Sequence, residues 1–251
     1  MRTVKLTLSY DGAAYAGWQA QPGERTVQET LEGAVIKVTG QRTGTIASGR
    51  TDAGVHALGQ VVAFRTESGL PADVLQRALN AELPHDIAVL KVVEAAGGFH
   101  PIRDAARKRY RYVLHDGPVR DVFKRAYCWH YNRGRLDAEA MDRAAKSLLG
   151  KHDFCSFQSS GSPRESTLRT VFDIGVERGR GAGDDCVTVE IEADGFLYNM
   201  VRAIVGTLVE VGRGAQPESW LPDVLQAADR SAAGPTAPPQ GLFLVKVDYE
   251  S

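Results

Sequence analysis

Residues 3–10 have the sequence Thr-Val-Lys-Leu-Thr-Leu-Ser-Tyr, in which polar and apolar side chains alternate. Such alternation is typical of a β-strand with one buried face, because successive side chains of a strand point to opposite sides. A turn-rich stretch, residues 11–24, follows this strand. Thr26-x-x-Glu29 then forms a capping box that opens a helix, and Gly40 closes it. The chain therefore begins as a strand followed by an amphipathic helix.

The next fifty residues extend this pattern. Two further strands are expected at residues 43–48 and 59–66, and Pro71 begins a second helix with apolar residues on one face. Residues 86–94 are mostly apolar, as expected for a buried strand. The first half therefore has the order β-α-β-β-α-β, which is typical of the ferredoxin-like motif.

The second half is expected to repeat that order. Strands are predicted at residues 108–115, 126–132, 169–178, 186–194 and 241–249, and helices at 137–149 (closed by Gly150), 198–211 and 219–228. We predict an α+β protein with two ferredoxin-like halves, whose antiparallel sheets lie side by side with a basic cleft between them. The boundary falls within residues 95–106, which gives an N-terminal half, 1–100, and a C-terminal half, 101–251.

Composition excludes several classes of protein. The 251 residues are 43% hydrophobic and 24% charged, unlike a disordered or fibrous chain. No apolar run is long enough to span a membrane, and the N-terminus lacks the apolar block of a signal peptide. The three cysteines are too far apart for a CxxC zinc pair, and the six histidines show no metal-binding spacing. We therefore expect a cytoplasmic protein with no membrane association and no metal.

Charge is concentrated in one window. Residues 101–135 contain ten basic and three acidic residues, a net charge of +7 in a chain whose net charge is −1. Aromatic residues are interleaved there: Tyr110, Tyr112, Tyr127, Trp129 and Tyr131. Basic groups that bind phosphates, together with rings that stack on bases, are typical of a surface for single-stranded or flipped nucleotides. The alternative is an ordinary solvated face.

A single carboxylate stands out in residues 48–56, Ser-Gly-Arg-Thr-Asp-Ala-Gly-Val-His. Small residues and two glycines flank Asp52, so a ligand can approach the backbone closely. The alternative is an Asx turn, in which Asp52 bonds only to its own backbone.

One charged side chain interrupts an otherwise apolar helix. Between Met200 and Val209, Arg202 is the only charged residue. Its guanidinium must either extend to solvent or meet a carboxylate. Asp52 is a candidate partner, and such a pairing would keep Asp52 ionised.

These residues belong to a longer series of motifs. In order they are Tyr10-Asp11-Gly12, Gly17-Trp18-Gln19, Thr26-Val27-Gln28, Gly49 to His56, Asn80-Ala81-x-Leu83-Pro84, Phe99-His100, Lys108-Arg109-Tyr110-Arg111-Tyr112, Asn199-Met200-Val201-Arg202, Val205-Gly206, and Ala237-Pro238-Pro239-x-Gly241-Leu242. In this order and spacing, over nearly the whole chain, the sequence resembles the bacterial tRNA pseudouridine synthase A (TruA-type) family. It departs from the family pattern at Ala20 and at Pro101-Ile102-Arg103, and both departures concern RNA-contacting surfaces rather than Asp52.

The resemblance implies an isomerase that needs no cofactor and no metal. It implies a homodimer that binds the tRNA anticodon stem-loop and converts uridines at positions 38, 39 and 40 to pseudouridine. By motif position, Asp52 is the nucleophile and Tyr110 stacks on the target base. Arg202 pairs with the aspartate, and Arg50 helps to displace the base.

Pseudouridine forms when the bond from ribose C1′ to uracil N1 breaks and a bond from C1′ to C5 replaces it, after the base has left its stack. Asp52 can add to C6, attack C1′ or remove the C2′ proton, and the sequence does not choose among these steps. Two alternative functions are a non-catalytic RNA-binding protein and a small-molecule glycosyl enzyme, which would require a second carboxylate.

Overall fold

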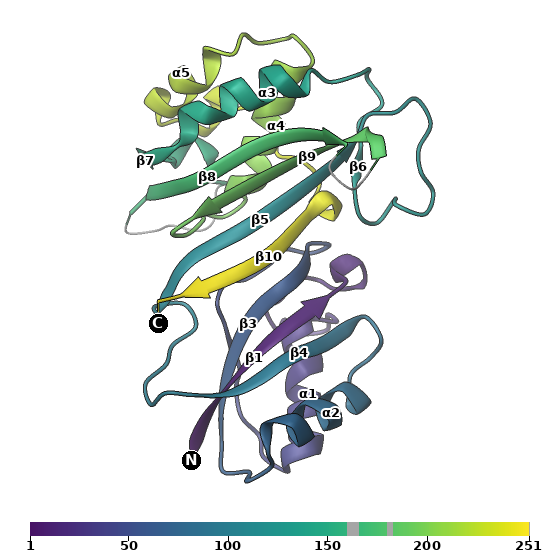
Figure 1. Cartoon of the computed structure of the whole chain (residues 1–251), viewed down its shortest axis with the longest axis vertical. Coiled ribbons are helices and arrows are strands. Elements are labelled where there is room, and N and C mark those ends of the chain that lie inside the picture. Colours follow the sequence, from purple (N-terminus) through teal and green to yellow (C-terminus); the bar gives the residue numbers. More distant parts are fainter. Residues whose placement is uncertain (160–165, 180–182, 251) are drawn as a thin grey trace. The chain divides into compact units, whose positions relative to one another are not determined.

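The computed structural model describes residues 1–159, 166–179 and 183–250 of a mixed α+β protein (Figure 1). Its elements group into two compact units. Unit 1 comprises Met1–Ala106 together with the last strand, from Phe243 onward, and unit 2 comprises Arg107–Leu242. None of the helices formed by the described residues has both the length and the apolar character needed to cross a membrane.

Unit 1 combines a sheet with two helices. Its elements are β1 (Arg2–Tyr10), α1 (Val27–Thr39), β2 (Ile46–Ala47), β3 (His56–Thr66), α2 (Ala72–Glu82), β4 (Ile87–Ala95) and β10 (Leu242–Tyr249). β1 lies between β4 and β3 and is antiparallel to both, and the short β2 pairs antiparallel with β3. β10 runs parallel to β3 at its start, where Phe243 pairs with His56.

Most of the local patterns that predicted unit 1 are present in it, but the strand expected at residues 43–48 is reduced to Ile46–Ala47. Val4, Leu6, Leu8 and Tyr10 are buried, as the alternation of β1 requires. The Thr26 hydroxyl accepts a hydrogen bond from the Glu29 N–H and caps α1, which ends at Gly40 with a φ of 71°. Glycine adopts that left-handed conformation without the steric cost that a Cβ would add.

Unit 2 combines strands of the ten-stranded sheet with three helices, so its strands do not form the separate sheet that was predicted. Its elements are β5 (Ala105–His115), β6 (Trp129–His130), α3 (Ala138–Ala145), β7 (Gly150–Asp153), β8 (Leu168–Gly179), β9 (Gly183–Ala193), α4 (Met200–Gly212) and α5 (Trp220–Ala227). The strands follow the order β5-β9-β8-β7, each antiparallel to its neighbour. α3 packs against β8 and α4, and Figure 1 shows the three helices on one side of the strands.

The element order of unit 2 differs from the predicted repeat. The strand expected at residues 126–132 is reduced to Trp129–His130 and pairs parallel, not antiparallel, with β5. The helix expected to reach residue 149 ends at Ala145 in a 3₁₀ turn, and Gly150 begins the unpredicted strand β7 instead of capping the helix. Residues 180–182, which join the strands predicted at residues 169–178 and 186–194, lie outside the described residues.

The last strand is also placed differently. By chain order, residues 241–249 are expected in the second half, whereas β10 pairs with β3 of unit 1. The sequence does not reveal this pairing, because the alternation of polar and apolar residues shows which face of a strand is buried but not which strand lies beside it.

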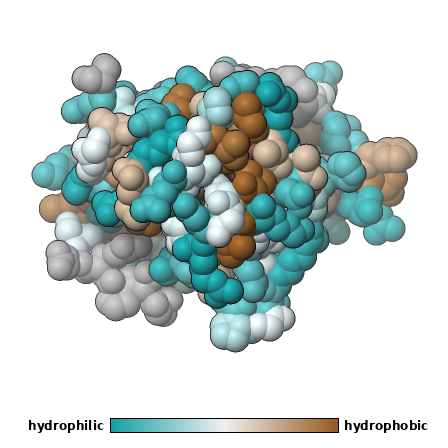
Figure 2. All heavy atoms as spheres, turned by 90° about the horizontal axis from the view of Figure 1, so that it is seen from below, coloured by the Kyte–Doolittle hydropathy of each residue, from teal (hydrophilic) through white to brown (hydrophobic). Residues whose placement is uncertain are grey.

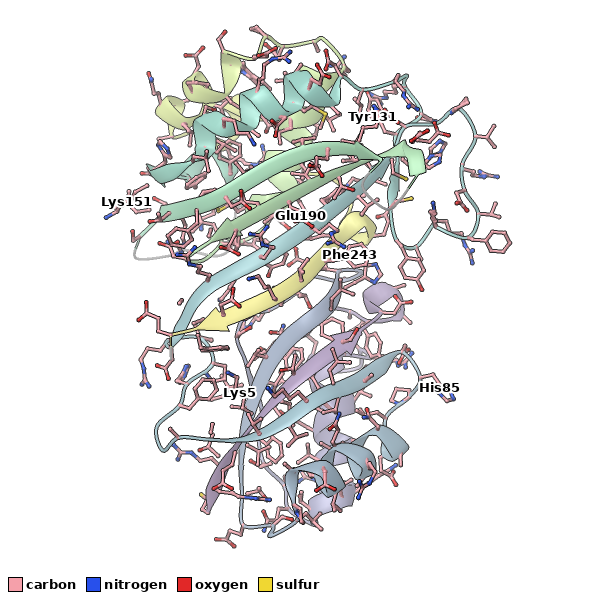
Figure 3. The ribbon with its side chains drawn as sticks, viewed as in Figure 1. Lys5, His85, Tyr131, Lys151, Glu190 and Phe243 are labelled. Atoms are coloured by element: carbon pink, nitrogen blue, oxygen red, sulfur yellow. The ribbon has the colours of Figure 1, made fainter. Side chains whose placement is uncertain are left out.

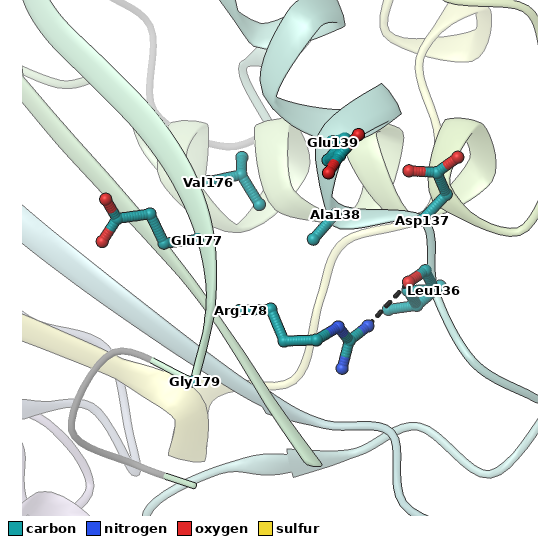
Figure 4. Close-up of a pocket in the computed structure, with 8 residues that line it drawn as sticks. All are labelled: Leu136, Asp137, Ala138, Glu139, Val176, Glu177, Arg178 and Gly179. Atoms are coloured by element: carbon teal, nitrogen blue, oxygen red, sulfur yellow. Dashed lines mark hydrogen bonds between the residues drawn. The ribbon is translucent and has the colours of Figure 1, made fainter. Parts of the chain in front are cut away.

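A buried ion pair holds the start of α3 against β8 in unit 2. Arg178 donates to both carboxylate oxygens of Asp116, at 2.9 and 2.8 Å. It also donates to the carbonyl oxygen of Leu136 at 2.6 Å, a bond that Figure 4 shows. The Leu136 N–H donates to Asp116 at 2.8 Å, and Arg135 lies 3.6 Å from the same carboxylate. The surface hollow beside this network is therefore lined by groups with a structural role.

The same contacts set the ionisation of Asp116. Burial by itself would raise the pKa of the carboxyl group, but the hydrogen bonds from Arg178 and Leu136 and the two guanidinium charges outweigh burial and lower it. Asp116 therefore stabilises the folded state above its ordinary pKa, and that contribution is lost as the pH falls through the lowered folded value.

We expect Asp116→Asn to lower the free energy of unfolding by about 2–3 kcal/mol at pH 7, because hydrogen bonds to a charged group are lost. In urea unfolding followed by circular dichroism, the difference from wild type should shrink when the pH falls from 7 to 3. Asp185→Asn, which removes a half-exposed carboxylate paired with Arg135, is the control and should change stability by less than about 0.5 kcal/mol. An equal effect of Asp116→Asn at both pH values would contradict this account of the ion pair.

Candidate functional site

Asp52 lies in the loop between β2 and β3, and its side chain is partly exposed. Its neighbour Thr51 is buried, at 6% exposure, and Arg50 on the other side is exposed. Thr51 thus faces the interior, while the residues on both sides of it reach the surface. The Val55 N–H donates to the Asp52 carbonyl at 3.1 Å and closes the turn. The predicted loop with a carboxylate near its tip is therefore present.

The segment from Gly12 to Trp18 lies directly against this loop. The Trp18 N–H donates to the Thr51 carbonyl at 3.0 Å. A Cβ on Gly17 would lie 2.7 Å from the Thr51 carbonyl oxygen, and one on Gly12 would lie 1.9 Å from that of Val55. Only glycine permits so close an approach of two backbone segments. The motif residues at the N-terminus therefore support the loop.

His56 begins β3 immediately after the loop. Its ring is almost fully buried and stacks on Phe243 with ring centroids 4.7 Å apart. Nδ1 of the ring lies 3.1 Å from the Gly12 N–H and 3.1 Å from a carboxylate oxygen of Asp11. His56 is thus part of the packing behind the loop.

Tyr110 lies on β5 in unit 2, directly opposite Ile191 of β9. Its ring is 8% exposed and meets the Phe196 ring edge to face, with centroids 5.0 Å apart. Such aromatic pairs favour a fixed ring orientation. Phe196 was not predicted, because nothing in the sequence marks it apart from other apolar residues.

Arg202 lies in the first turn of α4, whose neighbouring residues are buried. Its Nε donates to the Ala237 carbonyl, and Nη1 donates to the Asn199 side-chain oxygen, both at 2.7 Å. Two neutral oxygens of unit 2 therefore help to orient the guanidinium. Asn199 is the first residue of the Asn-Met-Val-Arg motif, but its hydrogen bond to Arg202 was not predicted.

The segment around Ala237 packs closely against α4 and β5. A Cβ on Gly206 would lie 1.6 Å from the Pro235 carbonyl oxygen, and one on Gly241 would lie 2.7 Å from the Tyr112 ring. The Tyr112 hydroxyl donates to the Pro238 carbonyl at 2.7 Å, and burial strongly raises the pKa of this phenol. The glycines and prolines of the C-terminal motif therefore fix the carbonyl group that binds Arg202.

The basic window is more nearly neutral than its residue count suggests. On β5, Arg109 and Arg111 lie directly opposite Glu192 and Glu190 of β9. Arg111 donates to Glu190 at 2.7 Å and Arg109 donates to Glu192 at 3.0 Å, and both carboxylates are almost fully buried. Arg107 also bonds to Glu192. Figure 3 labels Glu190 on β9, where these pairs converge.

A smaller set of basic residues has no acidic partner among those the structure describes: Arg120, Arg125 and Arg133. The Arg125 guanidinium donates to the Val122 carbonyl, a neutral group. The cations of the window that are least neutralised therefore lie after β5, and the arginines within that strand are paired with glutamates. The sequence alone does not show which basic residues are neutralised, because their pairing with glutamates depends on strand register.

Within residues 1–159, 166–179 and 183–250, no group of three or more His, Cys, Asp or Glu side chains is arranged to hold a metal ion. The three cysteines are not in disulfides. The predicted site residues fall into two sets: Arg50 and Asp52 in one loop of unit 1, and Tyr110 and Arg202 on two elements of unit 2.

Comparison with known proteins gives a consistent result. The tRNA pseudouridine synthase family model matches residues 7–100 and 144–250. Proteins named tRNA pseudouridine synthase A from Thermoanaerobacter sp. (strain X514), Acetivibrio thermocellus and Moorella thermoacetica are 47%, 46% and 47% identical to this chain, over 99% of it and 100% of each relative.

A solved structure of an H/ACA RNP bound to a substrate RNA containing 2′-deoxyuridine is 12% identical and covers 82% of this chain and 53% of that one, with a TM-score of 0.35. That likeness is too distant to support a conclusion. The family match and the full-length relatives together show that the chain belongs to the tRNA pseudouridine synthase family.

Proposed function

We propose that this protein converts uridines at positions 38, 39 and 40 of the tRNA anticodon stem-loop to pseudouridine, with Asp52 as its catalytic residue. Family membership makes it an isomerase that acts on tRNA. The observation that carries the role of Asp52 is local: a partly exposed carboxylate follows a buried, hydrogen-bonded Thr51 in the Gly-Arg-Thr-Asp-Ala-Gly motif. The side chain is thus held on an ordered loop and remains accessible.

Asp52 would act as an anion on a base that has left the helix stack. The carboxylate would take part in breaking the bond from C1′ to N1 and in forming the bond from C1′ to C5. Arg202 would pair with it and keep it ionised, and Arg50 would help to displace the base from its stack. Arg202 is suited to this role because the bonds to Ala237 and Asn199 already orient its guanidinium.

We expect Asp52→Asn to abolish pseudouridine formation and to leave tRNA affinity within about several-fold, because the carboxylate acts in the reaction and contributes little to binding the large polyanion. Chemical mapping of pseudouridine in treated tRNA checks the product and its position. Asp73→Asn, which removes an exposed carboxylate on α2, is the control and should keep wild-type activity. Turnover by the Asp52 variant, or product outside positions 38–40, would contradict the proposal.

Tyr110 would supply the flat face on which the target uracil stacks. Stacking of a base on an aromatic ring is worth about 1–3 kcal/mol. The edge contact with Phe196 holds the Tyr110 ring in one orientation and supports this role.

We expect Tyr110→Phe, which keeps the ring, to retain much more activity than Tyr110→Leu, which removes it. Steady-state kinetics on tRNA, with urea unfolding to confirm that both variants fold, would measure the difference. Equal losses in the two variants would assign the role to the hydroxyl group instead, as a proton acceptor or donor.

The protein would bind tRNA in the cytoplasm as a homodimer. Arg120, Arg125 and Arg133, which have no acidic partner among the described residues, are the candidates for contact with phosphates. Three cysteines outside disulfides agree with a reducing compartment. Each unit would be a variant of the ferredoxin-like arrangement, with unit 2 carrying the additional strand β7.

A second copy of the chain would cover an apolar segment that follows β5. Figure 2 shows a face on which hydrophobic residues lie among hydrophilic ones. The most exposed large apolar side chains between β5 and β6 are Val119 (76%), Val122 (52%) and Phe123 (86%). Asp121 accepts hydrogen bonds from the N–H groups of Phe123 and Lys124, so the segment is ordered while it presents these side chains. Exposed apolar patches of this kind mark protein interfaces.

In sedimentation analysis, the wild-type protein should have about twice the 27.2 kDa mass of the chain, and Phe123→Asp should shift it towards the monomer, because burying a charge at an apolar interface is costly. Leu90→Asp, at a half-exposed position on β4, is the control and should remain dimeric. A monomeric wild type would refute the homodimer. A dimeric Phe123→Asp variant would place the interface elsewhere.

A further inference from the structure

The loop that carries Asp52 is attached to the interior through the residue before it. The Thr51 side-chain oxygen lies 2.8 Å from the hydroxyl oxygen of Tyr10, and this contact is buried. The Thr51 carbonyl accepts a second hydrogen bond from the Trp18 N–H. Thr51 is thus held by its side chain and by its backbone, and its position therefore fixes the backbone of Asp52.

Tyr10, the last residue of β1, is 4% exposed. Burial raises the pKa of its phenol to about 12, although hydrogen bonds with Thr51 and Gln60 act in the opposite direction. The hydroxyl therefore stays protonated at neutral pH and remains available as a hydrogen-bond donor.

Gln60, on β3, lies behind the same loop and is fully buried. Its Nε2 donates to the Gly49 carbonyl at 2.8 Å and to the Tyr10 hydroxyl at 3.4 Å. Its Oε1 accepts from the Ser48 hydroxyl at 2.7 Å. Both polar ends of the amide are therefore used, and the Tyr10 oxygen accepts from Gln60 while its hydroxyl shares a hydrogen bond with the Thr51 hydroxyl.

Together these bonds fix the chain on both sides of Arg50. Gln60 holds the Gly49 carbonyl, and Tyr10 and Trp18 hold Thr51. A buried polar group that loses its partner costs more than the bond itself contributes, so a network in which every member is satisfied favours a single loop conformation. The residues of this network can act through the loop, without contact to a substrate.

We propose that Tyr10 and Gln60 are positioning residues for the isomerisation: through Thr51 and Gly49, they hold the Asp52 carboxylate in its reactive place. The inference rests on the catalytic role proposed for Asp52. Misplacing a reacting group by about 1 Å can slow a reaction about 100-fold. The effect of breaking this network should therefore appear in the rate of the chemical step.

The alternative is that the network contributes only to stability. Thr66 provides the comparison, because it lies at the other end of β3, is 1% exposed, and its hydroxyl donates to the Gln41 side chain at 2.7 Å. Thr66→Val removes a part-buried hydrogen bond from the same unit, at a position distant in sequence from the Asp52 loop. It should lower the urea midpoint and leave the rate unchanged.

The first test compares Tyr10→Phe with Thr66→Val in single-turnover pseudouridine formation on tRNA. Tyr10→Phe removes only the hydroxyl, and we expect the rate to fall about 10-fold or more while the Kd for tRNA stays within about 2-fold. A Tyr10→Phe variant with the wild-type rate would overturn the inference. So would an equal slowing by Thr66→Val, since a general loss of stability would then explain both results.

The second test asks whether Tyr10 acts through Thr51. Thr51→Val removes the hydroxyl and should match the loss in Tyr10→Phe, whereas Thr51→Ser restores the hydroxyl and should restore most of the rate. The double variant Tyr10→Phe/Thr51→Val should be no slower than either single variant, because the two changes break the same bond. Losses that multiply in the double variant would overturn the inference.

The same measurements separate this inference from the function on which it rests. A wild-type protein that forms no pseudouridine, or an Asp52→Asn variant that does, would refute the proposed function. Normal dependence on Asp52, together with wild-type rates in Tyr10→Phe and Thr51→Val, would refute only the positioning role.

Discussion

The close contact between the backbone at Gly12–Trp18 and the loop of Asp52 constrains the whole of unit 1. Two polypeptide segments approach so closely there that a single Cβ on Gly12 or Gly17 would overlap a carbonyl oxygen. Both segments bury polar backbone groups, and each such group needs a hydrogen-bond partner. The Trp18 N–H satisfies the Thr51 carbonyl, and Tyr10 and Gln60 satisfy groups on either side. The loop is therefore held by the interior behind it.

In unit 2, the extent to which a basic side chain is neutralised depends on its neighbours in space and not on its neighbours in sequence. A count along the sequence gives a strongly basic window, yet the register of β5 and β9 places Arg109 and Arg111 opposite Glu192 and Glu190. Directly opposed side chains of opposite charge stabilise a sheet. Burial alone would lower the pKa of Arg109, but its bonds to Glu192 and Asp173 outweigh burial and raise it. These arginines therefore already form ion pairs within the folded protein in the absence of RNA.

Local sequence signals predicted local structure well and long-range pairing poorly. The capping box at Thr26 and the alternation of β1 correspond to the observed helix and strand, because both depend on neighbours within four residues. The pairing of β10 with β3, and the parallel pairing of β6, depend on residues far apart in sequence. Alternation identifies a buried face without naming the strand beside it.

The candidate site shows the same division. Asp52 was recognisable because glycines and a motif surround it, and Arg202 because it is a charge within an apolar helix. The residues that orient them were not recognisable. Gln60 looks like any polar residue of a strand until the register places it behind Gly49, and the Ala237 carbonyl carries no side-chain signal at all.

Three of the proposed site residues, Asp52, Arg202 and Tyr110, are held by contacts inside their own unit. Thr51 and its partners hold the backbone next to Asp52, Ala237 and Asn199 hold Arg202, and Phe196 holds the ring of Tyr110. The entropy of fixing these side chains is therefore lost when the chain folds and not when it binds RNA. Preorganised groups stabilise a transition state more effectively than mobile ones, because they need not reorient as charge develops. A reaction that must detach a base, keep it and reattach it depends on such order, since a loosely held carboxylate would allow the free base time to escape.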